Sequence, residues 1–131
     1  MSFDPRTVSA GTFPAHVGIE VLEAGGGAAL GRLQVRDIHL APNGYLHAGA
    51  VVALADTVCG FGCVASLGEG APGFATIEVK TNFLGTAREG TITCRGKLVH
   101  GGRTTQVWDA TVEDQSGRPM ALFRCTQLLL V

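Results

Sequence analysis

The chain has 131 residues, of which 46% are apolar and 16% are charged, and its formal net charge is −1. This length suits one domain with one sizeable core, and the apolar fraction excludes a disordered chain. The basic residues are scattered, so the sequence lacks the dense basic surface that nucleic-acid binding requires.

The sequence also indicates a compartment. No positively charged segment followed by an apolar stretch opens the chain, so we expect a cytoplasmic protein in a reducing environment. The cysteines lack C-x-x-C spacing and are interpreted as small core residues, with a metal-binding pair at Cys59 and Cys63 as the less favoured alternative. We expect no metal and no separate cofactor. The cysteines are Cys59, Cys63, Cys94 and Cys125.

The first part of the chain predicts an arm and a hairpin. Residues 1–15 have no clear period and are expected to form an N-terminal arm, whereas residues 16–131 are expected to form a single domain. Apolar residues alternate from 16 to 24 and again from 28 to 35, on either side of Gly25-Gly26-Gly27. This pattern favours two strands joined by a glycine turn.

A long apolar segment follows at residues 48–67, AGAVVALADTVCGFGCVASL, in which Asp56 is the one charged residue. It is too long and too rich in alanine for a strand, and it predicts a helix that Gly68 and Gly70 end. A membrane span is the competing interpretation, which the glycines, Asp56 and the flanking strands disfavour. Because the helix is apolar around its whole circumference, it requires cover on every side.

Only strands are predicted after the helix. Alternating residues and glycine turns favour an antiparallel meander of four strands, over residues 74–84, 91–100, 103–114 and 120–131. The element order is therefore β-β-α-β-β-β-β. One curved antiparallel sheet can wrap most of the helix, and the remaining side requires another layer or another chain.

Asp56 is the first candidate for chemistry. A carboxylate midway along a buried helix is costly unless it is paired or hydrogen-bonded. It is therefore either a satisfied buried acid, for example one capped by Thr57, or a partly desolvated base or nucleophile.

The start of the helix is the second candidate. Its free backbone N–H groups and the positive end of its dipole can accept a substrate oxygen, and the small residues Ala48 and Gly49 allow a close approach. Asn43 and His47 add side-chain donors nearby. The alternative is that Asn43 is a turn residue and His47 a helix cap.

Helix geometry constrains how these candidates can combine. His47 and Asp56 are nine residues apart. They therefore point to opposite sides of the helix and lie about 13 Å apart along its axis. If both act on one substrate, they come from two chains, and two antiparallel helices related by a two-fold axis would bring them together.

The segment from Asn43 to Gly49, followed by Leu54-Ala55-Asp56-Thr57, resembles the hot-dog-fold thioesterases of the phenylacetate-degradation and 4-hydroxybenzoyl-CoA type. Their pattern is an Asn, then His-Gly-Gly at the start of the central helix, then an acid nine residues after the His. The resemblance implies an α+β hot-dog fold, in which a curved antiparallel sheet wraps one long central helix. It also implies hydrolysis of acyl-CoA or aryl-CoA thioesters by a homodimer or a dimer of dimers.

The resemblance assigns roles to residues of two chains. In one chain Asp56 would be the general base or nucleophile, and Thr76, on the strand after the helix, would position the water. The neighbouring chain would polarise the carbonyl through the amide of Ala48, with Gly49 beside it. That chain's Asn43 and His47 would orient substrate or water. The sequence departs from the family pattern in having alanine at position 48, and in having Asn43 four residues before His47 where relatives often have six.

Binding of the CoA moiety is less strongly indicated. Its phosphates require Arg or Lys near a loop. Gly102-Arg103-Thr104, in a tight hairpin, resembles the place where relatives hold the nucleotide, and Arg88 is a second candidate. Both arginines can equally be exposed surface cations.

Two other functions remain open at this point. A hot-dog hydroxyacyl dehydratase also uses a histidine and an acid, but the proline-rich segment before its helix is absent here. A non-catalytic acyl-CoA-binding module is the other alternative, which the presence of Asp56 and Thr76 disfavours. The acyl group itself cannot be assigned from the sequence, because an apolar pocket is built by the fold.

Overall fold

The fold was analysed in a computed structural model, which describes residues 8–68 and 73–130. The first seven residues of the expected arm, Gly70 at the expected helix end and Val131 lie outside the described residues.

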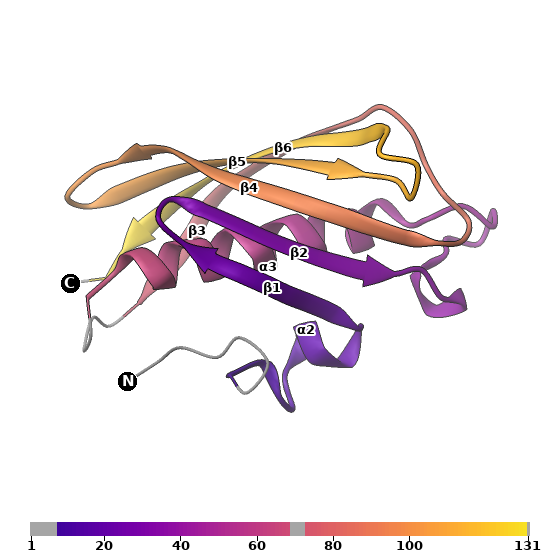
Figure 1. The fold of residues 1–131 in the computed structure, drawn as a ribbon, viewed down its shortest axis with the longest axis horizontal. Helices are drawn as coiled ribbons and strands as arrows, with labels where there is room; N and C mark the ends of the chain where they lie inside the picture. Colours follow the sequence, from indigo (N-terminus) through magenta and orange to yellow (C-terminus); the bar gives the residue numbers. More distant parts are fainter. Residues whose placement is uncertain (1–7, 69–72, 131) are drawn as a thin grey trace.

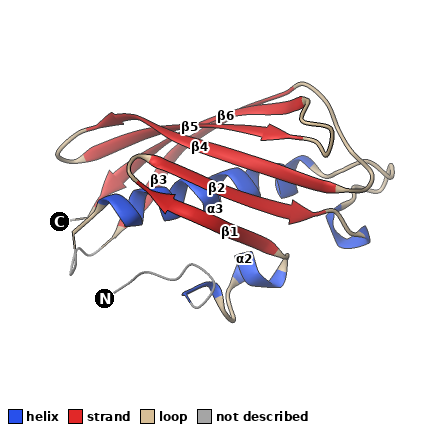
Figure 2. Ribbon diagram, viewed as in Figure 1, coloured by secondary structure: helices blue, strands red, loops and turns tan. Residues whose placement is uncertain are grey.

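The described chain forms one six-stranded antiparallel sheet and one long helix, as predicted (Figure 1). The sheet curves over one side of the helix, so the molecule has two layers (Figure 2). The strands are β1 (Ile19–Gly25), β2 (Ala28–Gln34), β3 (Phe74–Phe83), β4 (Thr91–Gly101), β5 (Thr105–Glu113) and β6 (Pro119–Leu129). The helices are α2 (Phe13–His16), the 3-10 turn η1 (Asp37–His39) and α3 (Ala48–Ser66).

The order of the strands corrects one prediction. The sheet order is β1-β2-β4-β5-β6-β3, so only β4, β5 and β6 form the expected meander. β3 pairs with β6 at the sheet edge, and the segment from Leu84 to Gly90 crosses back to β4. The local alternation of β3 could not reveal this, because a strand pattern does not specify which neighbour the strand pairs with.

The first hairpin forms as predicted. β1 and β2 pair from Ile19↔Leu33 to Gly25↔Ala28 and are joined by Gly26 and Gly27. These two glycines have φ of +63° and +80°. Two-residue hairpin turns of this hand require positive φ at both positions, which glycine adopts without strain.

α3 lies beneath the sheet and ends one residue before the predicted limit. Two of its glycines are explained by close packing of aromatic rings. A Cβ on Gly62 would approach the Trp108 ring to 2.5 Å, and one on Gly60 would approach the Phe74 ring to 2.9 Å. Although α3 is long and apolar enough to cross a membrane, core helices share these properties, and this packing accounts for them here.

The cysteines are core residues, as expected. All four side chains are buried between α3 and the sheet and are free thiols. Burial raises the pKa of Cys63 to about 11 and that of Cys94 to about 12, and a hydrogen bond with Cys125 together with burial raises the pKa of Cys59.

Candidate active site

Asp56 and Thr76 are brought together by the packing of α3 against β3. The Thr76 hydroxyl donates a hydrogen bond of 3.2 Å to Oδ1 of Asp56. Thr76 faces the helix just before a β-bulge that lies between Thr76 and Glu78. Thr57, the partner considered from sequence, instead lines the adjacent pocket.

The environment of Asp56 makes it a stronger base than an ordinary aspartate. Burial raises the pKa of its carboxyl above 3.8, and the hydrogen bond from Thr76 opposes this shift in part. Since Thr76 occupies Oδ1, the other carboxylate oxygen is left to accept a proton.

A pocket of about 280 Å³ opens beside Asp56. It is almost wholly apolar and lies between α3, the start of β3 and the N-terminal segment. Its lining residues are Val8, Pro14, Asp56, Thr57, Gly60, Phe61, Val64 and Phe74. A carboxylate that lines an apolar pocket suits chemistry on the polar end of an apolar acyl group.

His47 caps the start of α3. Its Nδ1 accepts the Gly49 N–H at 2.8 Å, which leaves Nε2 free to donate. The absence of a side chain at Gly49 allows this contact, because a Cβ there would lie 2.9 Å from Nδ1. Ala48, the first residue of the helix, has no acceptor for its N–H within the helix. Of the two small residues, Ala48 therefore offers the free amide.

Asn43 lies in the turn that precedes the helix. Its Oδ1 accepts the Tyr45 N–H at 3.1 Å, and Gly44 follows with a φ of +87°. The side-chain carbonyl therefore stabilises the turn, as the alternative interpretation held. The NH2 group of Asn43 remains available to donate to a ligand.

His47 and Asp56 line different pockets. His47 and Gly49 contribute to a pocket of about 200 Å³ that also contains Ala50, Ala53 and Phe13. None of its lining residues is shared with the pocket beside Asp56. Ala53 of one pocket and Thr57 of the other are four residues apart on α3, so the two pockets follow one another along the helix.

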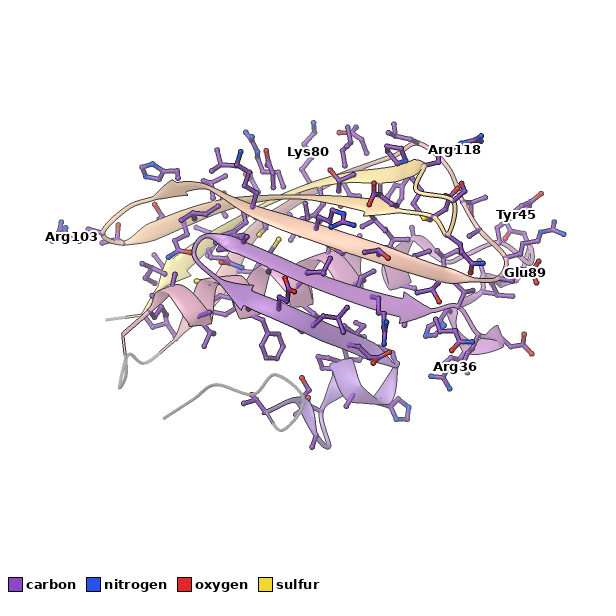
Figure 3. The ribbon with its side chains drawn as sticks, in the orientation of Figure 1. Arg36, Tyr45, Lys80, Glu89, Arg103 and Arg118 are labelled. Carbon is purple, nitrogen blue, oxygen red and sulfur yellow. The ribbon has the colours of Figure 1, made fainter. Side chains whose placement is uncertain are left out.

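The two candidate CoA-binding arginines lie at opposite ends of one chain. Arg103 is at the tip of the β4–β5 hairpin, between Gly102 and Thr104, whereas Tyr45 lies at the far end of the molecule (Figure 3). Arg88 stacks on the Tyr45 ring, 4.2 Å from its centre. One chain therefore cannot use both arginines for a single nucleotide.

His39 supports the start of the helix and was not found from the sequence. It is 3% exposed. Its Nδ1 accepts the Arg36 N–H at 2.9 Å, and its Nε2 hydrogen-bonds the Val17 carbonyl at 2.6 Å. Its own carbonyl accepts the His47 N–H at 2.8 Å. A histidine in an irregular segment carries no periodic signal that would have indicated this role.

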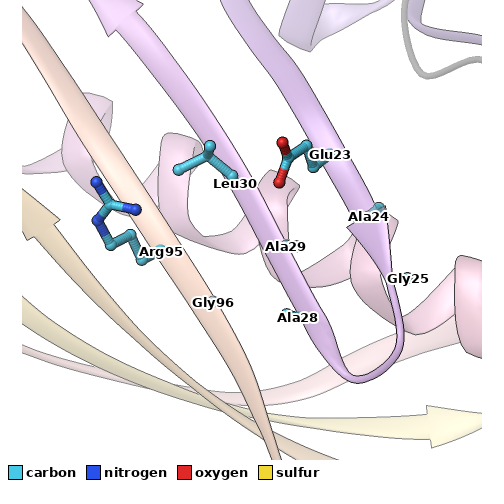
Figure 4. Close-up of a pocket in the computed structure, with 8 residues that line it drawn as sticks. All are labelled: Glu23, Ala24, Gly25, Ala28, Ala29, Leu30, Arg95 and Gly96. Atoms are coloured by element: carbon cyan, nitrogen blue, oxygen red, sulfur yellow. The ribbon is translucent and has the colours of Figure 1, made fainter.

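A further pocket, of about 400 Å³, lies on the outer face of the sheet, away from α3 (Figure 4). It is lined by Glu23, Arg95 and Leu30 together with small residues of β1, β2 and β4. Arg95 is engaged in an ion pair with Glu113 at 3.0 Å. This pocket contains none of the candidate catalytic residues.

Comparison with known proteins identifies the family. A model of the thioesterase superfamily matches residues 43–121. The 1,4-dihydroxy-2-naphthoyl-CoA hydrolase of Listeria monocytogenes is 31% identical over 84% of this chain and 89% of its own length. The enzyme of the same name from Escherichia coli is 32% identical over 88% of this chain and 79% of its own length.

The fold agrees equally well. The crystal structure of a variant of a thioesterase from Pseudomonas aeruginosa superposes with a TM-score of 0.93 and 25% identity, covering 99% of this chain and 96% of that one. The matched region contains the start of α3, Asp56 and Thr76. The chain belongs to the thioesterase superfamily, has the hot-dog fold of its members, and is a thioester hydrolase.

Proposed function

We propose that the protein hydrolyses acyl-CoA or aryl-CoA thioesters as a homodimer, with each active site shared between two protomers. The supporting observation is that His47, at the start of α3, and Asp56, nine residues further along it, line separate pockets. A two-fold dimer with antiparallel helices would place Asp56 and Thr76 of one protomer beside Asn43, His47 and Ala48 of the other. A dimer of two such dimers is compatible with the same site.

In the proposed reaction Asp56 acts as general base. Its unoccupied carboxylate oxygen takes a proton from a water molecule as the water oxygen attacks the thioester carbonyl carbon. The developing oxyanion accepts a hydrogen bond from the Ala48 amide of the partner subunit, and the helix dipole favours that negative charge. Collapse breaks the carbon–sulfur bond, and the proton on Asp56 passes to the departing CoA thiolate. The products are a free acid and CoA.

Asp56 can also act as the nucleophile. Its carboxylate would then displace the CoA thiolate to form a mixed anhydride, which water hydrolyses in a second step. The hydrogen bond from Thr76 to Oδ1 fits either role, because it leaves the second oxygen to react. Single-turnover hydrolysis in ¹⁸O-water separates them: only the anhydride route can leave the label in Asp56.

The two ends of the substrate would meet different parts of the protein. The apolar pocket beside Asp56 suits the acyl or aryl group, because its walls are Phe61, Val64 and Phe74. The CoA phosphates require a cation, and Arg103 is favoured over Arg88 because Arg88 is already stacked on Tyr45.

The function is tested by measuring free-thiol release from short, long and aryl acyl-CoAs. We expect turnover of at least one class, and its loss in the Asp56→Asn variant. Tight acyl-CoA binding without thiol release in the wild-type protein would favour the binding module. Conversion of a 3-hydroxyacyl thioester to an enoyl thioester would favour a dehydratase.

A further inference from the structure

Gln127 is a fully buried side chain with unused hydrogen-bonding groups. It lies on β6, is 0% exposed, and neither its Oε1 nor its Nε2 has a partner in the described part of the chain. A buried amide group without partners is costly, so a glutamine at such a position calls for a function.

The sheet places Gln127 between two hydrogen-bonded groups. Across one side of β6 it pairs with Thr76, and across the other it pairs with Gln106. Residues directly opposite in antiparallel strands have Cβ atoms about 5 Å apart, within reach of a glutamine side chain. All three side chains belong to the inner face of the sheet, the face that packs on α3.

Thr76 and Gln106, on either side of Gln127, already make hydrogen bonds. Thr76 donates to Asp56, as described above. Gln106 accepts the Trp108 indole N–H at 2.7 Å and donates from Nε2 to the Ser66 hydroxyl at 2.8 Å. Gln106 therefore retains one N–H, and the Thr76 oxygen retains lone pairs that can accept.

The donors and acceptors that remain match in one direction only. Neither bond is made at the position that the Gln127 side chain has in the structure. A rotation of that side chain would let the free N–H of Gln106 donate to Gln127 Oε1 and Gln127 Nε2 donate to Thr76 Oγ1. When the Thr76 oxygen accepts this hydrogen bond from Gln127, its own proton is directed at Asp56. We propose that Gln127 is a positioning residue, which directs the Thr76 hydroxyl onto Asp56 and connects the site to the buried Trp108–Gln106–Ser66 group.

Few other groups near Asp56 titrate in the range concerned. Its neighbours on the helix are the thiols of Cys59 and Cys63, whose raised pKa values keep them protonated. The Cys125 thiol is on β6. Glu78 and Lys80 of β3 belong to the outer face, as Figure 3 shows for Lys80, and the N-terminal segment contributes Val8 and Pro14 to the pocket.

The proposal is tested with Gln127→Met, which conserves shape and removes the amide. Without the donor behind it, the Thr76 hydroxyl can rotate away, so the ionised form of Asp56 loses stabilisation. We expect the pKa of Asp56, followed by NMR of carboxyl-labelled aspartate and assigned with Asp56→Asn, to rise by about 0.3 to 1. We expect kcat to fall about 3- to 10-fold with KM little changed.

Two further variants separate positioning from packing. Thr81→Val also removes a buried hydroxyl without a partner from the inner face of β3, and it should leave the pKa of Asp56 unchanged. In a Thr76→Val background, Gln127→Met should have no further effect on that pKa. An unchanged pKa in folded Gln127→Met, or equal effects with and without Thr76, would overturn the proposal.

Only the kinetic readout depends on the proposed function. If the pKa responds as expected but no thioester is hydrolysed, the proposed function fails and the role of Gln127 is retained.

Discussion

His47, at the start of α3, and Asp56, nine residues further along the chain, line separate pockets. Within one protomer no substrate carbonyl can contact both the start of the helix and the carboxylate. The arrangement therefore makes a direct prediction about mixed dimers.

Two inactive variants should restore activity when combined. Asp56→Ala removes the base, and Ala48→Leu blocks the start of the helix, but each leaves the other element intact. In a mixed dimer one site combines both intact elements and the other carries both lesions. Refolding the variants together in equal amounts should return about a quarter of wild-type activity, for independent sites in a two-fold dimer.

Co-expression with two different tags allows the doubly tagged species to be assayed alone. Two differently tagged Asp56→Ala chains are the matched control and should stay inactive. A purified heterodimer without activity would show that both groups act within one chain.

Asp56→Asn should abolish most turnover and stabilise the fold. Asparagine can still accept the hydrogen bond from Thr76 but cannot take a proton, so kcat should fall at least about 10²-fold. The ionised carboxyl of the wild-type protein is a partly desolvated charge, and its removal should raise Tm. Circular dichroism and thiol release measure the two effects, and near-normal turnover in a folded variant would exclude Asp56 from catalysis.

As the pH is lowered, the enzyme should lose activity at a higher pH than it would if Asp56 had the pKa of an ordinary aspartate. The reactive form is the carboxylate, and burial raises the pKa of Asp56 above 3.8, so kcat/KM should fall as the pH is lowered through that raised value. The stability effect has the opposite sign. A raised pKa in the native state gives stability below the unfolded value that is lost as the pH rises through the folded value. The stability gained from Asp56→Asn should therefore grow with pH, which urea titrations at several pH values can measure.

Thr76→Val should lower the activity without abolishing it. The change removes the hydrogen bond that lowers the pKa of Asp56, so the acid limb of the kcat/KM profile should move to higher pH. We expect kcat to fall by less than in Asp56→Asn, about 10-fold, because one charge-assisted hydrogen bond is lost. Thr76→Ser, which retains the hydroxyl, should behave like the wild type. A silent Thr76→Val would assign the positioning of the water to another residue.

The sequence predicted the elements better than their arrangement. The helix over residues 48–67 was found within one residue of Ala48–Ser66 because its length, composition and single charge are local properties. The position of β3 at the sheet edge was not found, because pairing depends on the long crossover from Leu84 to Gly90 rather than on alternation.

The residues of the candidate site likewise differ in how far the sequence could predict them. Asp56 was recognisable because a charge in an apolar helix stands out locally. His39 and Gln127 were not, because their importance arises from burial and from neighbours distant in sequence: Val17 for His39, and Thr76 for Gln127. For Asn43 the sequence left two roles open, a donor near the helix and a turn residue, and the fold shows that its carbonyl accepts a hydrogen bond within the turn.

The buried cysteines affect how this enzyme can be assayed. All four thiols are 0% exposed. Those of Cys59, Cys63 and Cys94 also have raised pKa values that suppress the reactive thiolate. A disulfide reagent that detects released CoA should therefore react very little with the thiols of the folded protein. The same reagent becomes a probe of motion when no substrate is present, because a thiol can react only while α3 and the sheet separate. Its slow consumption would then report how often the two layers open.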